Sequence, residues 1–208
     1  MWSGPVPIRK GEAWGAVGPL PPDTVVVRSN TQARAVVTDA RRNGRAIPPL
    51  ALLGGDLCRT LGGTGDEARL RSGGATEVGV DLGAVLLDGR LHWFLAHLVA
   101  RKGWWRGRVV VAMNAQFIGR WDVAPRGHPN DGRLELLDAD LPLGTRMQVR
   151  SRLATGTHVP HPGIEESHVS SQQLDLDQPT SVYLDGDLVG TARHLSLRVE
   201  PNALRCFL

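Results

Sequence analysis

The sequence predicts an α+β protein, with a short α/β segment ahead of a β-rich domain that forms a sandwich. Between residues 23 and 76 a strand, a helix, a strand, a glycine turn and a second helix follow one another, as in one βαβ-like unit. After Glu77, short aliphatic runs alternate with Gly, Asp and Pro turns, which is typical of an antiparallel sandwich. The predicted divisions are an extended arm (1–22), a shortened α/β segment (23–76) and a β-rich domain (77–208).

The arm is predicted from its five prolines and four glycines, which disfavour a packed unit. The α/β segment has strands expected at 25–27 and 50–53 and helices at 31–42 and 57–61. The first helix has apolar residues at helical spacing and ends at Asn43-Gly44, because glycine tolerates the left-handed cap conformation.

The β-rich domain should contain one hairpin that closes at Asp88-Gly89 and one helix at 143–153. Its strands are expected at 78–83, 85–87, 91–95, 108–113, 134–138, 173–176, 181–184 and 194–200. We find no internal repeat or low-complexity tract.

Composition narrows the class of protein. Hydrophobic residues make up 41% and charged residues 22%, which is typical of an ordered soluble protein, and no apolar run is long enough to span a membrane. The two cysteines, Cys58 and Cys206, have no ligand-like spacing, and the start lacks a signal-peptide pattern. A cytoplasmic location is therefore expected. A net charge of +3 is too small for a dedicated nucleic-acid binder, so we do not expect a nucleic-acid partner.

Three segments of the β-rich domain occur in a specific order. They are VVVAMNAQFIGRWDVAP (109–125), NDGRLEL (130–136), and SVYLDGDLVG (181–190) followed by LRVEPNAL (197–204). In order and spacing they resemble the second domain of diacylglycerol kinase and sphingosine kinase-like lipid kinases, within the NAD kinase-like superfamily. The resemblance implies the β-sandwich of that second domain and ATP-dependent phosphorylation of a lipid hydroxyl, with ATP and Mg²⁺ as cofactors.

The resemblance places catalysis at Asp185-Gly186-Asp187. It implies that Asp187 is the general base, where the family has glutamate, and that Asp185 organises the metal and the substrate. Without the family context, the same residues are an ordinary hairpin turn between two strands.

The resemblance also implies a structural cation in the turn at 128–133. Its ligands would be the carboxylate of Asp131 and the main-chain carbonyls of His128 and Arg133, an all-oxygen set that suits Mg²⁺ or Ca²⁺. A capped turn without an ion is the alternative. The nearby histidines, His158 and His161 with His168, have no standard zinc spacing, and we do not favour zinc there.

The segment from Leu50 to Gly63 resembles the family's nucleotide-binding segment, which implies cofactor contacts from Gly54, Gly55, Asp56 and Arg59. The position of the family's glycine-rich nucleotide loop is occupied by residues 28–32, Arg-Ser-Asn-Thr-Gln, which contain no glycine. A phosphate-cradling turn needs glycines so that backbone amides can approach the phosphate. We therefore expect little or no kinase activity from this chain alone, and we keep a non-catalytic lipid- or protein-binding module as the alternative.

Three further expectations concern partners. Basic residues flank the aromatic pair Trp104 and Trp105 at 101–108, and this pattern suits core packing, contact with a membrane surface or, least favoured, nucleic acid. Membrane contact would place the protein peripherally at the inner membrane surface. A shortened nucleotide half would leave β-edges that favour a homodimer or a partner chain that supplies the missing half.

Overall fold

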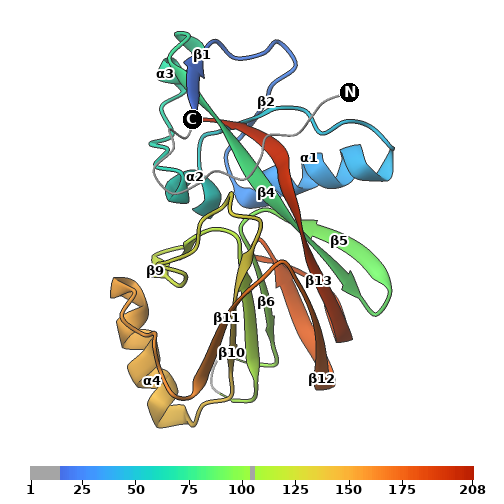
Figure 1. Ribbon diagram of the computed structural model, residues 1–208, viewed down its shortest axis with the longest axis vertical. Coiled ribbons are helices and arrows are strands. Elements are labelled where there is room, and N and C mark those ends of the chain that lie inside the picture. The colour runs from blue at the N-terminus through green and yellow to red at the C-terminus, as the bar shows by residue number, and fades with distance from the viewer. Residues whose placement is uncertain (1–14, 104–105) are drawn as a thin grey trace.

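The computed structural model describes residues 15–103 and 106–208, so most of the predicted arm and both Trp104 and Trp105 lie outside the described residues. Figure 1 shows an upper part that holds the first three helices of the chain and a lower part that holds most of the strands and the last helix. The strands of the main sheet are β1 (Ala16–Gly18), β2 (Val25–Val27), β3 (Leu50–Leu52), β4 (Ala75–Leu87), β5 (Arg90–Phe94), β6 (His97–Arg101), β7 (Val109–Met113), β10 (Leu134–Ala139), β11 (Ile164–Val169), β12 (Ser171–Leu184) and β13 (Asp187–Phe207). The other elements are the hairpin β8 (Phe117–Ile118) and β9 (Trp121–Asp122), the helices α1 (Asn30–Arg42), α2 (Asp56–Thr60), α3 (Glu67–Arg71) and α4 (Leu143–Arg152), and a 3₁₀ turn at Leu153–Thr155.

The upper part is a small α/β unit that the end of the chain completes. β2 pairs in parallel with β3, and β3 pairs in parallel with the last residues of β13, where Leu50 faces Cys206. Helix α1 is capped by the preceding Ser29, whose hydroxyl accepts the backbone N–H of Gln32. Its buried face presents Val37 to the core between helix and sheet.

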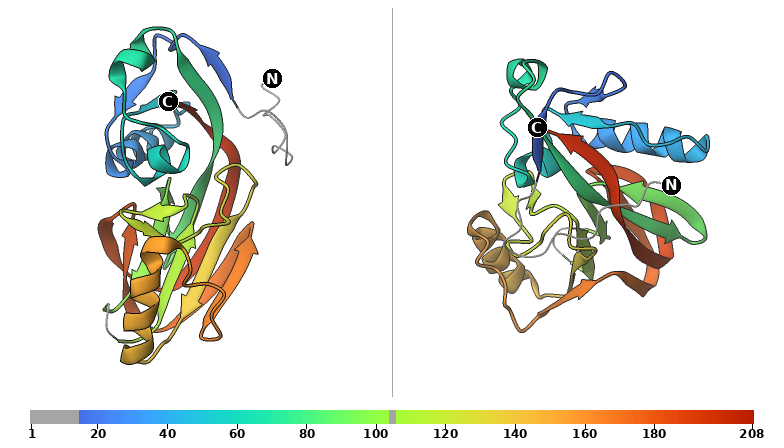
Figure 2. Two further views of the ribbon diagram at one scale, coloured as in Figure 1. Left: turned by 90° about the vertical axis from the view of Figure 1, so that its left-hand side faces the viewer. Right: turned by 45° about the horizontal axis from the view of Figure 1, so that its top comes forward.

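The long antiparallel pair β4 and β13 runs through both parts of the molecule and joins them (Figure 1). From there the strand order continues β12-β6-β7-β10-β11, so β11 lies at the end of this path. Figure 2 shows α4 lying along one side of the strands of the lower part. The fold is therefore α+β with a β-sandwich, as the sequence predicted.

The strands β6, β7 and β10 bury apolar residues on both faces. On one face Leu98, Val110 and Leu136 belong to the main core of the sandwich. On the opposite face lie Val111 and Leu137, which pack against the β8–β9 hairpin and the segment that follows α4. This second face carries the features from which the candidate sites are built.

Several predicted elements were right in kind and wrong in extent. The helices at 31–42 and 143–153 are confirmed, but the predicted strands at 173–176 and 181–184 are one strand, β12. Between Asp175 and Thr180 its pairing with β13 shifts register, so Pro179 sits in an irregularity instead of a turn. Likewise 78–83 and 85–87 form one strand, and 194–200 is only the middle of β13. Of the predicted arm, residues 16–18 pair with β4 as β1.

Candidate functional site

The turn between β12 and β13 directs one of its two acidic side chains into the protein. Asp185 takes a left-handed conformation (φ 52°) and its carboxylate is buried. The carboxylate accepts three backbone N–H groups, from Leu95 at 3.0 Å, Ala96 at 2.7 Å and His97 at 3.2 Å. An ordinary hairpin turn would leave this side chain in solvent, so the turn has the additional role of anchoring the start of β6.

Helix α1 supplies the cation that faces both acidic residues of the turn. Arg34 donates from Nη2 to Asp187 over 2.6 Å, and its Nε lies 3.9 Å from Asp185 Oδ2. Burial raises the pKa of Asp185 to about 6, against the opposing effects of the three backbone N–H groups and of Arg34. Asp187 differs from Asp185 because 46% of its side chain is exposed, so it can meet a ligand.

His97 connects this turn to α2. Its Nε2 lies 3.3 Å from Asp56 Oδ2, and burial lowers the pKa of the imidazole to about 4, so His97 is neutral at neutral pH. Burial also raises the pKa of Asp56. The hydrogen bond that Asp56 accepts from the Gly119 N–H and the charge of Arg59 both lower this pKa, but to a smaller extent. The carboxylates of Asp56 and Asp185 and the neutral imidazole of His97 therefore meet where the α/β unit joins the sandwich.

The predicted nucleotide segment is filled by neighbouring protein groups. The Oδ1 of Asn30 accepts the N–H of Leu57 at the start of α2, and its Nδ2 lies 3.3 Å from Asp56 Oδ2. A Cβ at Gly55 would lie 2.4 Å from Asn30 Oδ1, and a Cβ at Gly54 would lie 2.6 Å from a backbone carbonyl oxygen. The space on the Cβ side of Gly54 and Gly55 is thus occupied by protein atoms, and their contact with a nucleotide stays a prediction.

The other two predicted cofactor residues hold the β8–β9 hairpin. Asp56 Oδ1 accepts the N–H of Gly119 at 2.8 Å, and Arg59 Nη1 donates to the Gly119 carbonyl at 2.6 Å. The Arg59 guanidinium also lies 3.7 Å from the centre of the Phe117 ring. Both residues therefore position the hairpin, and their contact with a nucleotide stays a prediction.

An apolar cavity of about 140 Å³ lies beyond this hairpin, between the sheet and α4. β6 contributes Val99 and β7 contributes Val111, while Ile118 and Trp121 of the hairpin and Val149 of α4 complete much of the wall. His97 and Val99 are two residues apart on β6, so their side chains share one face of the strand. We call the group at the junction the acidic site, and it consists of Asn30, Arg34, Asp56, His97, Asp185 and Asp187. The cavity and the acidic site therefore lie on the same face of the sheet.

The turn predicted to hold a structural cation is tied to β4. The backbone N–H of Gly132 donates to the buried carboxylate of Asp81 at 2.7 Å, while Asp131 Oδ1 accepts the N–H of Arg133 at 2.9 Å. Burial raises the pKa of Asp81, and the negative charge of Asp131 adds to this rise. The cation set of Asp131 with the His128 and Arg133 carbonyls stays a prediction.

The remaining segments singled out in the sequence have structural partners. His158 is buried, with Nε2 3.1 Å from the Val123 carbonyl oxygen, and His161 Nδ1 accepts the N–H of Gly163. In the segment at 101–108, Arg101 stacks on the Tyr183 ring and Arg108 forms an ion pair with Asp138.

Sequence reasoning missed three residues of the acidic site. Arg34 and Asn30 belong to a helix that was assigned only by its apolar face, and His97 begins a strand that was not predicted. The one available signal was that Asn30 lies where the family's nucleotide loop has glycine.

The fold and the site together define a class of protein in which a β-sandwich meets an α/β unit, with acidic residues at the junction. A protein-family model described as the YegS C-terminal NAD kinase beta sandwich-like domain matches residues 87–208, which is more than half of the chain. The chain belongs to this family. The resemblance to diacylglycerol kinase-like lipid kinases is thereby confirmed.

Solved structures with the same fold come from Bacillus anthracis str. Sterne. One, provisionally assigned as a diacylglycerol kinase, has a TM-score of 0.68 and 12% sequence identity, over 88% of this chain and 77% of that chain. Another, described as a diacylglycerol kinase, has a TM-score of 0.61 and 15% identity, over 88% of this chain and 75% of that chain. Identities this low show a shared fold. A search of curated proteins found no match.

Proposed function

We propose that this chain binds a lipid alcohol, with part of an acyl chain in the apolar cavity and the hydroxyl at Asp187. The observation that carries the proposal is the shared sheet face of the cavity and the acidic site. His97 of the site and Val99 of the cavity wall are separated by about 7 Å along β6. A lipid alcohol has the same order of parts, because its polar hydroxyl end adjoins an apolar chain.

The size and the walls of the cavity support an apolar ligand. A cavity of about 150 Å³ lined by aliphatic and aromatic side chains holds a molecule of the size of benzene. The cavity here is about 140 Å³ and has aliphatic walls from β7 and β10, including Val111 and Leu137. It would hold a short stretch of an acyl chain, and the rest of the chain would lie outside.

The reaction of the class is phosphorylation of a lipid hydroxyl by ATP with Mg²⁺. In this chain we assign Asp187 as the carboxylate that accepts the hydroxyl proton, because it is half-exposed whereas Asp185 is buried. Asp185 keeps the turn in place through its three backbone bonds. Because Asn30 fills the start of α2, we propose that the chain alone transfers phosphate slowly. A second copy or a partner chain would then supply a nucleotide half.

Contact with a membrane surface is part of the same proposal. On α4, Leu143 and Met147 lie one turn apart with 53% and 58% of their surfaces exposed, and Val149 of this helix faces the cavity. None of the helices among the described residues is long and apolar enough to cross a membrane. We propose that α4 rests on the bilayer surface, where Arg150 would meet anionic headgroups.

The test is binding of a soluble short-chain diacylglycerol, measured by calorimetry, together with transfer of labelled phosphate from ATP. Val111→Phe should fill the cavity and weaken lipid binding at least about tenfold. Val17→Phe is the matched control, because Val17 is 73% exposed on β1, away from the cavity. Asp187→Asn should leave lipid binding intact and remove any phosphate transfer.

Two results would contradict the proposal. One is a wild-type protein that does not bind short-chain diacylglycerol, and the other is binding that Val111→Phe leaves unchanged. Membrane contact has its own measurement: Met147→Asp should reduce cosedimentation with anionic phospholipid vesicles without changing the binding of the short-chain lipid. Equal cosedimentation of the two proteins would count against the role of α4.

A further inference from the structure

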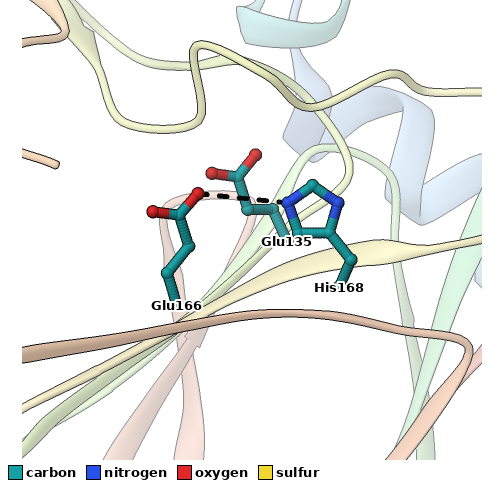
Figure 3. Close-up of side chains that lie close together, drawn as sticks. All are labelled: Glu135, Glu166 and His168. Carbon is teal, nitrogen blue, oxygen red and sulfur yellow. Dashed lines mark ion pairs between the residues drawn. The ribbon is translucent and has the colours of Figure 1, made fainter. Parts of the chain in front are cut away.

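Neighbouring strands bring two carboxylates and an imidazole together at the end of the sheet where β10 pairs with β11. In the antiparallel pair β10–β11, Glu135 faces His168, and Leu137 faces Glu166. Residues that face each other, or that are two apart on one strand, project to the same side of a sheet. Figure 3 shows the polar ends of Glu135, Glu166 and His168 close together, with Glu166 Oε1 4.0 Å from His168 Nε2.

Glu135 is unusual within this group because it is buried and receives no hydrogen bond from a donor. Only 3% of its surface is exposed, and neither carboxylate oxygen accepts an N–H or O–H from the described residues; its polar neighbour Glu166 is itself an acceptor unless one of the two carboxyls is protonated. A buried carboxylate without donors or a cation is costly, and such groups are rare in native proteins. We therefore expect the carboxylate of Glu135 to hold either a cation or a proton.

Two side chains near Glu135 also have buried polar atoms without hydrogen-bond partners. Asp122 Oδ1 and His158 Nδ1 are also buried and without hydrogen-bond partners within the part of the chain that the structure describes. The charge of Asp122 acts on both Glu135 and His158, so the three side chains are electrostatic neighbours. The nearest cation to Glu166 is the exposed Arg126, whose Nη1 is 3.9 Å from Oε1, too far for a hydrogen bond.

We propose that Glu135, Glu166 and His168 bind a divalent transition-metal cation, with Zn²⁺ as the best match and Mn²⁺ as the next. Each residue offers one ligand atom, and these atoms all lie within 4.8 Å of one another. One imidazole nitrogen with two carboxylate oxygens suits Zn²⁺ or Mn²⁺ better than Mg²⁺, which prefers oxygen ligands and keeps several waters.

The three ligand atoms must move only a short distance toward one another to bind one ion. Two ligands of a tetrahedral Zn²⁺ at about 2.0–2.1 Å stand roughly 3.3 Å apart, so the widest pair must approach by at most about 1.5 Å. His168 and Glu166 are partly exposed and can rotate toward the buried Glu135. A water would complete the coordination.

This cation site is separate from the one predicted at Asp131. The ligands at 128–133 are oxygens of one turn, whereas the new site uses side chains of two strands and an imidazole. An ion there would fasten β11, the last strand of the sheet path, to β10 and to the segment that carries Asp122. Val123 of that segment lines the apolar cavity, so the ion would also stabilise the cavity wall.

A proton is the competing occupant. Burial raises the pKa of Glu135 to about 7, and the neighbouring Glu166 adds to the rise. A proton shared by the two carboxylates would leave His168 without a role. Removal of the imidazole of His168 would therefore weaken the binding of a metal ion but would not affect a proton shared by the two carboxylates. The experiment uses this difference.

The experiment uses untagged, chelator-treated protein titrated with ZnCl₂ and then with MnCl₂, by calorimetry and by thermal unfolding. We expect one Zn²⁺ per chain at this site and a rise in Tm on addition of the metal. His168→Ala and Glu166→Gln should each weaken Zn²⁺ binding at least about tenfold. Both residues are partly exposed, so these variants should fold even if Glu135→Gln does not.

Two controls match these variants. Glu165→Gln removes an exposed carboxylate from the other face of β11, and Asp131→Asn removes the predicted oxygen site. Neither should change Zn²⁺ affinity. Absence of Zn²⁺ and Mn²⁺ binding by the wild type would overturn the proposal in favour of a shared proton. Zn²⁺ binding that His168→Ala and Glu166→Gln leave unchanged would overturn it in favour of another site. Neither result depends on lipid binding.

Discussion

The guanidinium of Arg34 donates to the carboxylate of Asp187 over 2.6 Å, which ties α1 to the turn between β12 and β13. The same guanidinium places Nε 3.9 Å from the buried Asp185. One side chain of the α/β unit thus faces the two acidic residues that the sequence assigned to catalysis. The junction between the two parts of the molecule therefore depends on charge as well as on apolar packing.

Replacement of Arg34 should destabilise the protein more than replacement of its exposed partner. Arg34→Ala leaves the buried carboxylate of Asp185 without this cation, and we expect a loss of about 1–3 kcal/mol in the free energy of unfolding. Asp187→Asn breaks an ion pair that is half in solvent and should cost about 1 kcal/mol or less. Urea unfolding at pH 7 measures both, with Arg34→Lys as the control that keeps a cation. Equal losses for Arg34→Ala and Asp187→Asn would contradict this assignment.

Gly55 tests how tightly Asn30 fills the start of α2. Gly55 has φ 93°, which side chains rarely adopt, and its Cβ would lie 2.4 Å from Asn30 Oδ1. Gly55→Ala should therefore cost about 3 kcal/mol or more. Gly62→Ala is the matched control, because Gly62 also has a positive φ (79°) but open space around it. It should cost about 1–2 kcal/mol. Similar losses in thermal unfolding would show that Asn30 can move away from Gly55.

The sequence predicted the architecture well because its signals are local. Apolar periodicity located α1 and α4, and ordered turns located most strands of the sandwich. The sequence-based prediction was wrong where tertiary contacts determine the secondary structure. In β12, for example, Pro179 is typical of a turn but lies in an irregularity of a continuous strand. The site was only half predictable for the same reason. Asp185 and Asp187 belong to a local motif, whereas Arg34 and His97 reach it from distant segments.

The predicted oxygen site at Asp131 gives a separate metal test. Its carboxylate neighbours the buried Asp81, and a cation would offset the repulsion between the two. Millimolar CaCl₂ or MgCl₂ should therefore raise the Tm of the wild type and should not raise that of Asp131→Asn. Asp177→Asn, an exposed carboxylate on β12, should behave as the wild type. A calcium-dependent Tm shift that persists in Asp131→Asn would move the ion elsewhere.

The junction contains two buried groups whose effects on the pH dependence of stability oppose each other. Burial lowers the pKa of His97 from 6.5 to about 4, so the unfolded chain binds more protons there and stability rises with pH between those values. Burial raises the pKa of Asp185 from 3.8 to about 6, so the native state binds more protons and stability falls as pH rises through that window. Each effect amounts to about 3 kcal/mol, and in the wild type they largely cancel between pH 4 and 6.

Single variants should separate the two effects. His97→Gln removes the contribution of His97, so relative to the wild type it should lose up to about 3 kcal/mol of stability from pH 4 to pH 6. Asp185→Asn removes the contribution of Asp185 and should gain a similar amount relative to the wild type over the same interval, although its absolute stability is lower because the N–H of Leu95 loses its acceptor. Urea unfolding at pH 4, 5, 6 and 7 gives these differences directly. Three parallel pH profiles would show that neither group titrates as its burial requires.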